Sequence, residues 1–396
     1  MKIAMSNLER FRVLTAIGAA SFLFGTLPTS AVAYLNGIDV YAGDNGNNNV
    51  QPVNWTTVKN GGYTFAFVKA DDGSQDTDPA FATNMTGANA AGVYVGPYHF
   101  AHTESLSPYG TPKFDNYSGG ALAYDSPIQV NKDAWTDATL EAVDFIDLVR
   151  PYYYQTGTTH FLLPVSDIEQ KYMPALSASL KKEFVSNWAQ VFSDAVYDAL
   201  GVRPMLYVSK SSANENFTPA VAQQQPFWIA WYRGTGTTQP PLQSDTQNFP
   251  LWSFWQWTDT GSVAGVHGSG SSGTDVDKDV FNGTINQLAA MTVQLVQGDY
   301  NHNKTVDASD YVSWRKEMSL PTAKYNAYSV AFLGADGNLS NKVDAGDYTY
   351  WRSQFGKTLS GSGSGSEFGS GTVPEPFSIS LLLAGLFGQM FTRQRR

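Results

Sequence analysis

The chain has 396 residues, of which 42% are hydrophobic and 14% aromatic, with 35 acidic against 25 basic residues. This length and apolar content allow one large core plus a smaller unit and exclude a disordered protein. The net charge of −10 offers no basic face for nucleic acid. Because the sequence has no cysteine, an exported form would depend on core burial, or on metal, instead of disulfides.

Residues 1–33 have the three-part pattern of a secretory signal peptide. Three basic residues precede the apolar stretch Val13–Leu27, and the small residues Ala31-Val32-Ala33 form a cleavage site. We therefore expect export and a mature chain that starts near Tyr34. The alternative is an uncleaved anchor, but the apolar stretch is shorter than the ~20 residues that span a bilayer.

Residues 34–284 alternate short apolar runs with helical stretches, a pattern typical of strands joined by helices. The expected strands are Gly37–Val40, Phe65–Lys69, Val93–Tyr98, Phe161–Ile168, Met205–Val208, Phe227–Ala230 and Trp252–Trp257. The expected helices are Pro79–Ala91, Trp135–Val149 and Leu176–Leu200. Asp78 is the expected N-cap of the first helix, with Pro79 at its first position. The pattern predicts an α/β fold of barrel type.

Two carboxylates one residue apart, Asp167 and Glu169, close the apolar run that starts at Phe161. Such a strand end places acids at the mouth of a site, where one can be held protonated while another stays charged. Asp39 lies near the end of another expected strand, and the carboxyl ends of barrel strands form the active site. The arrangement favours glycoside hydrolysis. The alternative is a loop with two solvated acids.

An ordered series of motifs across this region resembles glycoside hydrolase family 25, the Chalaropsis-type lysozymes. The motifs are Gly37-Ile38-Asp39-Val40, Trp55 with Val58-Lys59, Phe65–Lys69 with Gly73, Asp78-Pro79 with Phe81 and Asn84, Ala91-Gly92, Gly96-Pro97-Tyr98-His99-Phe100, Asp167 with Glu169, Tyr207, Trp228-Ile229-Ala230 with Tyr232, Trp255-Gln256, and Val276-Asp277 before Phe281 and Gly283. The resemblance implies a flattened, irregular TIM-like (β/α) barrel. It also implies a muramidase that cleaves β-1,4 bonds in the glycan strands of peptidoglycan and needs no cofactor for catalysis.

The resemblance also implies roles for four acids. Glu169 looks like the general acid that protonates the leaving oxygen. Asp167 would orient or stabilise the substrate acetamido group in a substrate-assisted reaction. Asp39 and Asp277 look like the remaining acids of the cleft, and like charges nearby would help keep Glu169 protonated.

Some positions depart from the family pattern. Asp71-Asp72 precede Gly73 where relatives often have Thr-Glu, Asp279 stands where Asn is usual, and Trp257 stands where Tyr is usual. These departures, with the insertion Thr103–Asn131, leave the fine specificity open.

Aromatic residues near the expected strand ends are candidates for substrate binding. Tyr98, Trp228, Tyr232 and Trp255 could stack on sugar faces, and His99 could line the cleft. The alternative for each is packing in the barrel core.

Two further functional hypotheses remain open at this stage. One is a catalytically silent glycan-binding protein that is assembled on the cell surface through its C-terminal module. The other keeps the catalysis but changes the glycan. The presence of all four acids favours the enzyme.

Two similar segments, Asp299–Arg315 and Asp336–Arg352, form an internal duplication. Each fits a 12-residue calcium loop of the EF-hand kind, with oxygen ligands at positions 1, 3, 5, 7, 9 and 12. The expected ligands are Asp299, Asn301, Asn303, the Thr305 carbonyl, Asp307 and Asp310 in the first loop, and Asp336, Asn338, Ser340, the Lys342 carbonyl, Asp344 and Asp347 in the second. Position 6, usually Gly, is Lys304 or Asn341, so the first loop should be the more strained.

The duplication over residues 292–356 resembles a type I dockerin repeat pair, an all-α EF-hand-like module. The resemblance implies structural Ca²⁺, calcium-dependent folding and a cohesin-like partner. The alternative is a calcium-stapled helix pair with no partner.

The end of the chain combines a Gly/Ser-rich linker over 357–372 with a sorting pattern over 373–396. Val373-Pro374-Glu375-Pro376, the apolar run Phe377–Phe391 and three terminal arginines resemble a PEP-CTERM signal. The resemblance implies an exosortase-type processing enzyme, a transient membrane anchor and a location at the cell surface or outer envelope. The alternative is a permanent anchor, although the segment is short for one.

Overall fold

The computed structural model describes residues 34–46, 51–74, 76–103, 127–155, 159–169, 177–268, 275–318, 334–340 and 342–359. The expected signal peptide, the sorting segment, nearly all of the linker and most of the insertion lie outside the described residues. Within the described ranges, no helix combines the length and apolarity needed to cross a membrane.

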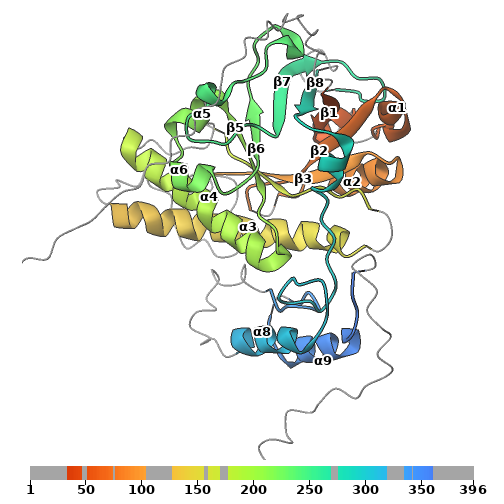
Figure 1. The fold of residues 1–396 in the computed structure, drawn as a ribbon, viewed down its shortest axis with the longest axis vertical. Coiled ribbons are helices and arrows are strands. Elements are labelled where there is room, and N and C mark those ends of the chain that lie inside the picture. The colour runs from red at the N-terminus through yellow and green to blue at the C-terminus, as the bar shows by residue number, and fades with distance from the viewer. Residues whose placement is uncertain are drawn as a thin grey trace, which may run out of the picture. The chain divides into compact units, whose positions relative to one another are not determined.

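Eight strands close into a single barrel in sequence order (Figure 1). The strands are β1 Leu35–Val40, β2 Tyr63–Asp72, β3 Tyr94–Phe100, β4 Val165–Asp167, β5 Met205–Ser209, β6 Phe227–Ala230, β7 Phe254–Gly261 and β8 Val276–Phe281. Neighbours from β1 to β7 pair in parallel, whereas β8 runs antiparallel to both β7 and β1. The predicted α/β barrel is therefore confirmed, and the antiparallel closing strand makes it irregular.

Along the chain, the first six described helices lie between barrel strands and the last three follow β8. They are α1 Trp55–Asn60, α2 Phe81–Ala90, α3 Pro127–Tyr153, α4 Ala178–Leu200, α5 Lys210–Glu215, α6 Pro219–Ala222, α7 Ile285–Ala289, α8 Ala308–Met318 and α9 Ala345–Gln354. The longest two, α3 and α4, pack along each other beside the barrel (Figure 1).

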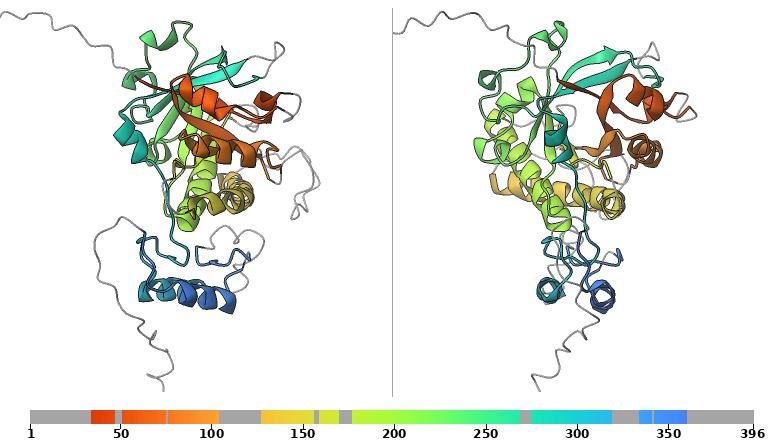
Figure 2. Two further views of the ribbon diagram at one scale, coloured as in Figure 1. Left: turned by 90° about the vertical axis from the view of Figure 1, so that its right-hand side faces the viewer. Right: turned by 45° about the vertical axis from the view of Figure 1, so that its right-hand side comes forward.

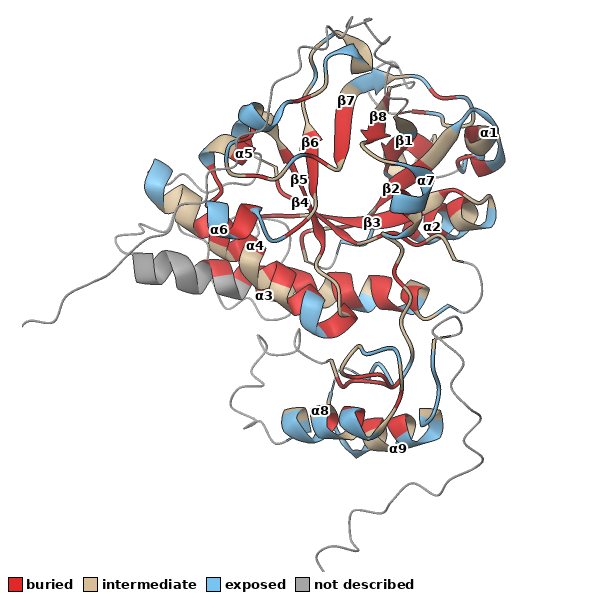
Figure 3. Cartoon of the chain, viewed as in Figure 1, coloured by how far each residue is buried: buried red, intermediate tan, exposed pale blue. Residues whose placement is uncertain are grey.

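The barrel is built by the period-two alternation of its strands, which places successive side chains on opposite faces. On β2, Phe65 and Phe67 point inward and contact the ring of Phe254 at centroid distances of 5.0 and 5.1 Å. Ala66 and Val68 point outward into the core beneath the helices. Most strand residues are thus buried on one face or the other (Figure 3). Each large apolar side chain so buried stabilises the fold by ~1.5–3 kcal/mol.

Two strand predictions differ from the structure. The expected strand Phe161–Ile168 is shortened to β4, because Pro164 has no N–H to donate and Phe161 forms only an isolated bridge to Val95. Strand β8 was not expected, since the three consecutive charged residues Asp277-Lys278-Asp279 interrupt its apolar residues.

The start of α2 also differs from its prediction. The helix begins at Phe81 with Ala80 as its N-cap residue, not at Pro79 with Asp78. Asp78 instead accepts hydrogen bonds from the backbone N–H groups of Ala80 at 2.8 Å and Ala42 at 2.9 Å. Its carboxylate therefore links the loop after β1 to the turn before α2.

The duplicated segments fold into the neighbouring helices α8 and α9, which lie side by side in both views of Figure 2. Trp314 donates its indole N–H to the Asp344 carbonyl at 2.9 Å, and Trp351 donates to the Asp307 carbonyl at 3.0 Å. Equivalent tryptophans thus bond equivalent carbonyls in the opposite copy. This reciprocity shows that the sequence duplication is also a structural one.

Candidate active site

Four acids gather at the carboxyl end of the barrel. Asp39 lies near the end of β1 and is the register partner of Asp277 on β8. Asp167 ends β4 and Glu169 follows two residues later. Asp39 and Glu169 both lie near enough to raise the pKa of Asp167 by charge repulsion. The structure therefore brings together the acids that the sequence placed far apart.

The side chain of Gln256 on β7 connects this cluster. Its Nε2 donates to Asp39 Oδ2 at 2.7 Å and lies 3.4 Å from Asp277 Oδ2. Its Oε1 accepts hydrogen bonds from the hydroxyls of Tyr207 at 2.7 Å and Tyr232 at 2.5 Å. Gln256 is buried, so this amide fixes the orientation of Asp39 without access to water. Gln256 was not predicted as a site residue, and the only signal was its place after Trp255 in one family motif.

The carboxyls around Asp39 favour their protonated forms. Burial, reinforced by the neighbouring Asp279, raises the pKa of Asp39 well above its usual value. Burial and the charge of Asp39 raise the pKa of Asp277 to about 10. Burial also raises the pKa of Asp279, although the Trp228 indole donates to its Oδ1 at 2.9 Å. This group can therefore hold protons at neutral pH.

Asp167 and Glu169 differ in their surroundings. Asp167 is 6% exposed, and burial followed by repulsion from Glu169 raises its pKa well above the usual range. Its Oδ1 has no hydrogen-bond partner among the described residues. Glu169 is half-buried and faces an open pocket. The two carboxyls are thus suited to different tasks.

The pocket has a volume of about 520 Å³. The described residues that line it are Glu169, Tyr207, Ser209, Lys210, Ser211, Ala230, Trp231 and Tyr232. Tyr207 also bonds Gln256, so the pocket wall is joined directly to the carboxylate cluster. An occupant of the pocket would lie beside Glu169.

One of the four predicted stacking aromatics lines this pocket. Tyr232 is 46% exposed there. Tyr98 and Trp228 instead pack inside the barrel, and Trp255 points outward and donates its indole N–H to the Trp231 carbonyl at 2.9 Å. Trp231, which was not predicted, lines the pocket because it directly follows β6 at the open end of the barrel.

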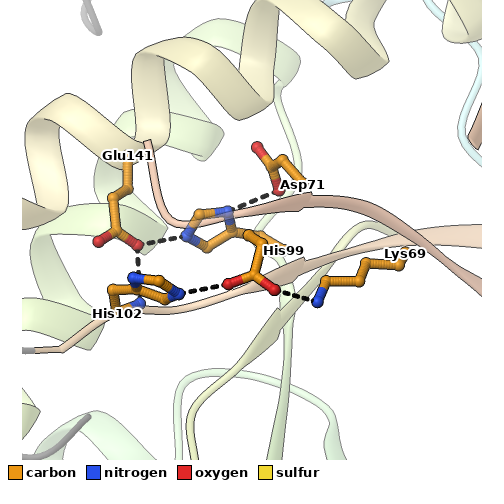
Figure 4. Close-up of polar contacts among 6 residues, drawn as sticks. Lys69, Asp71, His99, His102 and Glu141 are labelled. Carbon is orange, nitrogen blue, oxygen red and sulfur yellow. Dashed lines mark hydrogen bonds and ion pairs between the residues drawn. The ribbon is translucent and has the colours of Figure 1, made fainter. Parts of the chain in front are cut away.

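The expectation that His99 lines the cleft is wrong, because the structure buries the residue completely on the outer face of β3. His99 donates to Asp71 at 2.7 Å and to Glu141 of α3 at 2.7 Å (Figure 4). Its ring stacks on Phe192 of α4 at a centroid distance of 4.8 Å. Although burial works to lower it, the two carboxylates raise the pKa of His99 to about 10. His99 is therefore a charged link between barrel and helices.

A second chain of polar contacts runs from this link toward the acids (Figure 4). Glu141 accepts the backbone N–H of His102 at 3.1 Å, and the His102 ring contacts Asp72. Asp72 also pairs with Lys69. Although burial opposes them, His102 and Lys69 lower the pKa of Asp72 to about 2. The charge of Lys69 also opposes the rise in the pKa of Asp167. Asp72, which departs from the family pattern, is thus an anion that positions this lysine.

The duplicated loops show one hydrogen-bond pattern twice. The position-1 carboxylates accept backbone N–H groups from position 5, Asn303 to Asp299 at 3.1 Å and Ser340 to Asp336 at 3.0 Å. The position-12 carboxylates accept backbone N–H groups from positions 3 and 9: Asp310 from Asn301 and Asp307, and Asp347 from Asn338 and Asp344. Lys304 has a φ of 71°, the left-handed conformation expected for position 6. Asn341 lies outside the described residues.

No group of three or more His, Cys, Asp or Glu side chains in the described ranges is arranged to hold a metal ion. The predicted ligand set also uses Asn, Ser and carbonyl oxygens, and its side chains turn into the loops in the same register. The residues therefore fit the predicted Ca²⁺ coordination, which stays a prediction.

Comparison with known proteins finds a family and relatives that match the region of the barrel. The model of the family described as Glycosyl hydrolases family 25 matches residues 38–114 and 132–266. Lysozyme M1 of Streptomyces globisporus is 30% identical over 244 residues, which make up 60% of this chain and 67% of that protein. The N,O-diacetylmuramidase of Arthroderma benhamiae is 26% identical over 240 residues, 60% of this chain and 80% of that protein.

Among solved structures, the bacterial lysozyme from Streptomyces coelicolor aligns with a TM-score of 0.44 and 24% identity, covering 66% of this chain and 98% of that one. The family match spans more than half of the chain, including the strands that carry Asp39, Asp167 and Gln256. The protein is a glycoside hydrolase. It belongs to glycosyl hydrolases family 25.

Proposed function

We propose that the protein is a lysozyme that hydrolyses β-1,4 bonds in the glycan strands of peptidoglycan. The observation that carries this proposal is the pairing of Glu169, in an open pocket, with the buried Asp167 two residues away. The relatives include a lysozyme and a diacetylmuramidase, which supports the same substrate class. Membership in a hydrolase family favours this function over the catalytically silent alternative.

In the proposed mechanism, Glu169 is the general acid that donates its proton to the leaving glycosidic oxygen. Its place in the pocket wall gives it access to a bound sugar. Once the leaving group departs, the same carboxylate can accept a proton from the attacking water. The structure supports this assignment through position, since Asp167 is too enclosed to serve both steps.

Asp167 would receive the N–H of the substrate acetamido group. Its Oδ1 lacks a hydrogen-bond partner among the described residues, and a buried unpaired carboxyl oxygen is costly. An amide donor from the substrate would supply that partner and hold the acetamido oxygen toward the reacting carbon. Asp39 and Asp277, connected by Gln256, would shape the electrostatics around this pair.

The replacement Glu169→Gln tests the assignment, because the amide keeps the shape and removes the transferable proton. We expect hydrolysis to fall by at least ~10³-fold, in keeping with the loss of general acid catalysis, while glycan binding is retained. The assay is release of reducing ends from purified peptidoglycan, with mass spectrometry of the products. Glu215→Gln, an exposed acid on α5, is the matched control. Near-normal turnover by Glu169→Gln would remove Glu169 from the mechanism.

We propose that the flanking segments place this enzyme outside the cell. The signal pattern of residues 1–33 supports export, and the pattern of residues 373–396 supports sorting to the envelope by an exosortase-type enzyme through a transient anchor.

We also propose that residues 292–356 are a dockerin-like module that binds structural Ca²⁺ and docks a cohesin-like protein. The repeated carboxylate pattern of the two loops supports the calcium proposal. Asp310 and Asp347 are fully buried, and burial raises the pKa of each to about 6. A bound cation would offset that cost.

A further inference from the structure

One wall of the pocket carries a positive charge in a site otherwise dominated by acids. Among the described lining residues, Lys210 alone is cationic, and it lies three positions after Tyr207 along the chain. Nothing in the proposed catalytic roles uses this ammonium. The question is which group on a bound sugar it would meet.

Lys210 is held in place by aromatic contact. Its Nζ lies 4.1 Å from the ring centroid of Trp231, and Arg233 lies over the same ring at 4.3 Å. Arg233 is fixed in turn by donating to the Gln239 carbonyl at 3.1 Å. Two cations on one indole give the ring a defined position and keep the lysine stem against the pocket wall.

The ammonium of Lys210 keeps capacity for a further acceptor. Among the described residues it forms an ion pair with Asp245, with Nζ and Oδ1 3.9 Å apart, which is too long for a hydrogen bond. The lysine side chain is 36% exposed, and an ammonium has three N–H donors. A ligand oxygen in the pocket can therefore accept from it.

The surrounding charges select the ligand. A neutral sugar would leave the ammonium with its long ion pair to Asp245, whose Oδ1 lies 3.9 Å away, whereas an anionic group in the pocket could accept a charge-assisted hydrogen bond from it. A single carboxylate matches a single ammonium, and the faces of Trp231 and Tyr232 suit the sugar ring that would bear it.

We propose that Lys210, held by Trp231, binds a carboxylate on a substituent of the sugar that lies beside Glu169. This inference rests on the proposed function and deepens it, because it makes Lys210 a residue that selects acidic glycan. The carboxylate can come from the lactyl group of a sugar freed of its peptide or from the peptide stem itself.

The test compares three substrates: glycan strands stripped of peptides, the same strands with their carboxyls converted to neutral N-methylamides, and strands with intact stems. We expect Lys210→Met to raise KM for acidic strands about fivefold to tenfold with little change in kcat, as for loss of one charge-assisted contact at a partly exposed site. It should leave the amide strands unchanged, and Lys210→Arg should restore most of the loss. An effect on stripped strands assigns the lactyl carboxylate, and an effect confined to intact strands assigns the stem; each supports the proposal.

Lys59→Met is the matched control, since Lys59 donates to the Gly92 carbonyl just before β3, at the opposite end of the barrel. Equal effects of Lys210→Met on acidic and amide strands would overturn the proposal. The same strands are also titrated against Glu169→Gln with and without Lys210→Met. A parent without hydrolysis but with a Lys210-dependent preference for acidic strands would sink the lysozyme proposal and keep this one. A parent that hydrolyses the strands but shows no Lys210-dependent preference for acidic ones would keep the lysozyme proposal and overturn this one.

Discussion

Replacement of Gln256 by Leu is the sharpest test of how the acid cluster is held. The substitution keeps the volume of the side chain and removes its amide. Asp39 then loses the donor at 2.7 Å, and the Tyr207 hydroxyl loses the acceptor at 2.7 Å. Both partners are buried, so water cannot replace the amide.

The magnitude follows from these two bonds. Each buried polar group left without a partner costs ~1–2 kcal/mol, so the free energy of unfolding should fall by ~2–4 kcal/mol. The hydroxyl of Tyr232 adds little, because its side chain is 46% exposed and can be solvated. The hydrogen bond from Gln256 opposes the rise in the pKa of Asp39, so its removal raises that pKa further. The loss of stability in the variant relative to the parent should therefore grow as pH rises.

Urea denaturation of the parent and the variant at pH 5 and pH 8 measures these effects, with reducing-end release as the functional readout. Tyr207→Phe removes one of the two bonds and should cost ~1 kcal/mol. Gln224→Leu, at an exposed glutamine two residues after the end of α6, should stay within ~0.5 kcal/mol of the parent. A Gln256→Leu variant within ~1 kcal/mol of the parent at both pH values, with normal turnover, would refute the role given to this amide.

Three further outcomes are expected. Asp279→Asn removes a buried carboxyl whose raised pKa makes the parent lose stability as pH climbs above ~4. By pH 8 the free energy of unfolding of the variant, measured in urea, should therefore exceed that of the parent by on the order of 1–3 kcal/mol. Superimposable pH profiles of stability would contradict this. His99→Gln should cost ~3 kcal/mol at pH 6, where the imidazolium is fully formed. Because the pKa of His99 is raised from 6.5 to about 10, its contribution is lost as pH rises through that window, so the deficit should shrink there, and a constant deficit would argue against a charged His99. Chelation should unfold residues 292–356 while reducing-end release persists, and a helical signal indifferent to EDTA would exclude the calcium proposal.

The sequence predicted the barrel well where its strands are apolar on both faces. Six of the seven expected strands correspond to β1–β3 and β5–β7 within a few residues, because a run buried between barrel interior and helices contains few polar positions. Strand β8 escaped prediction because its inner face carries Asp277 and Asp279. These two acids interrupt the apolar pattern by which the other strands were predicted.

The site was predicted less completely, for two physical reasons. Residues that meet across the barrel are far apart in the chain, as with Asp39 and Gln256, which are separated by 217 positions. The sequence also does not say which residues of a strand point to which face of the sheet. Tyr98 and His99 are adjacent, and pleating sends one into the barrel and the other toward α3 and α4. A motif that contains both does not say which one faces the substrate.

The antiparallel closure by β8 explains why the acids crowd. In the register of the closing strand Asp277 pairs with Asp39, and Asp279 pairs with Gln256 on the other side. Because residues two apart share a face, both β8 acids point toward the same interior. Burial, together with this crowding, raises the pKa of Asp39, Asp277 and Asp279, and each raised pKa costs stability at pH values above the ordinary pKa of a carboxyl. A glycan bound in the proposed site, rich in hydroxyl and amide donors, would stabilise deprotonated carboxyls beside it, so substrate should stabilise the protein most at alkaline pH, where the cluster carries the most negative charge.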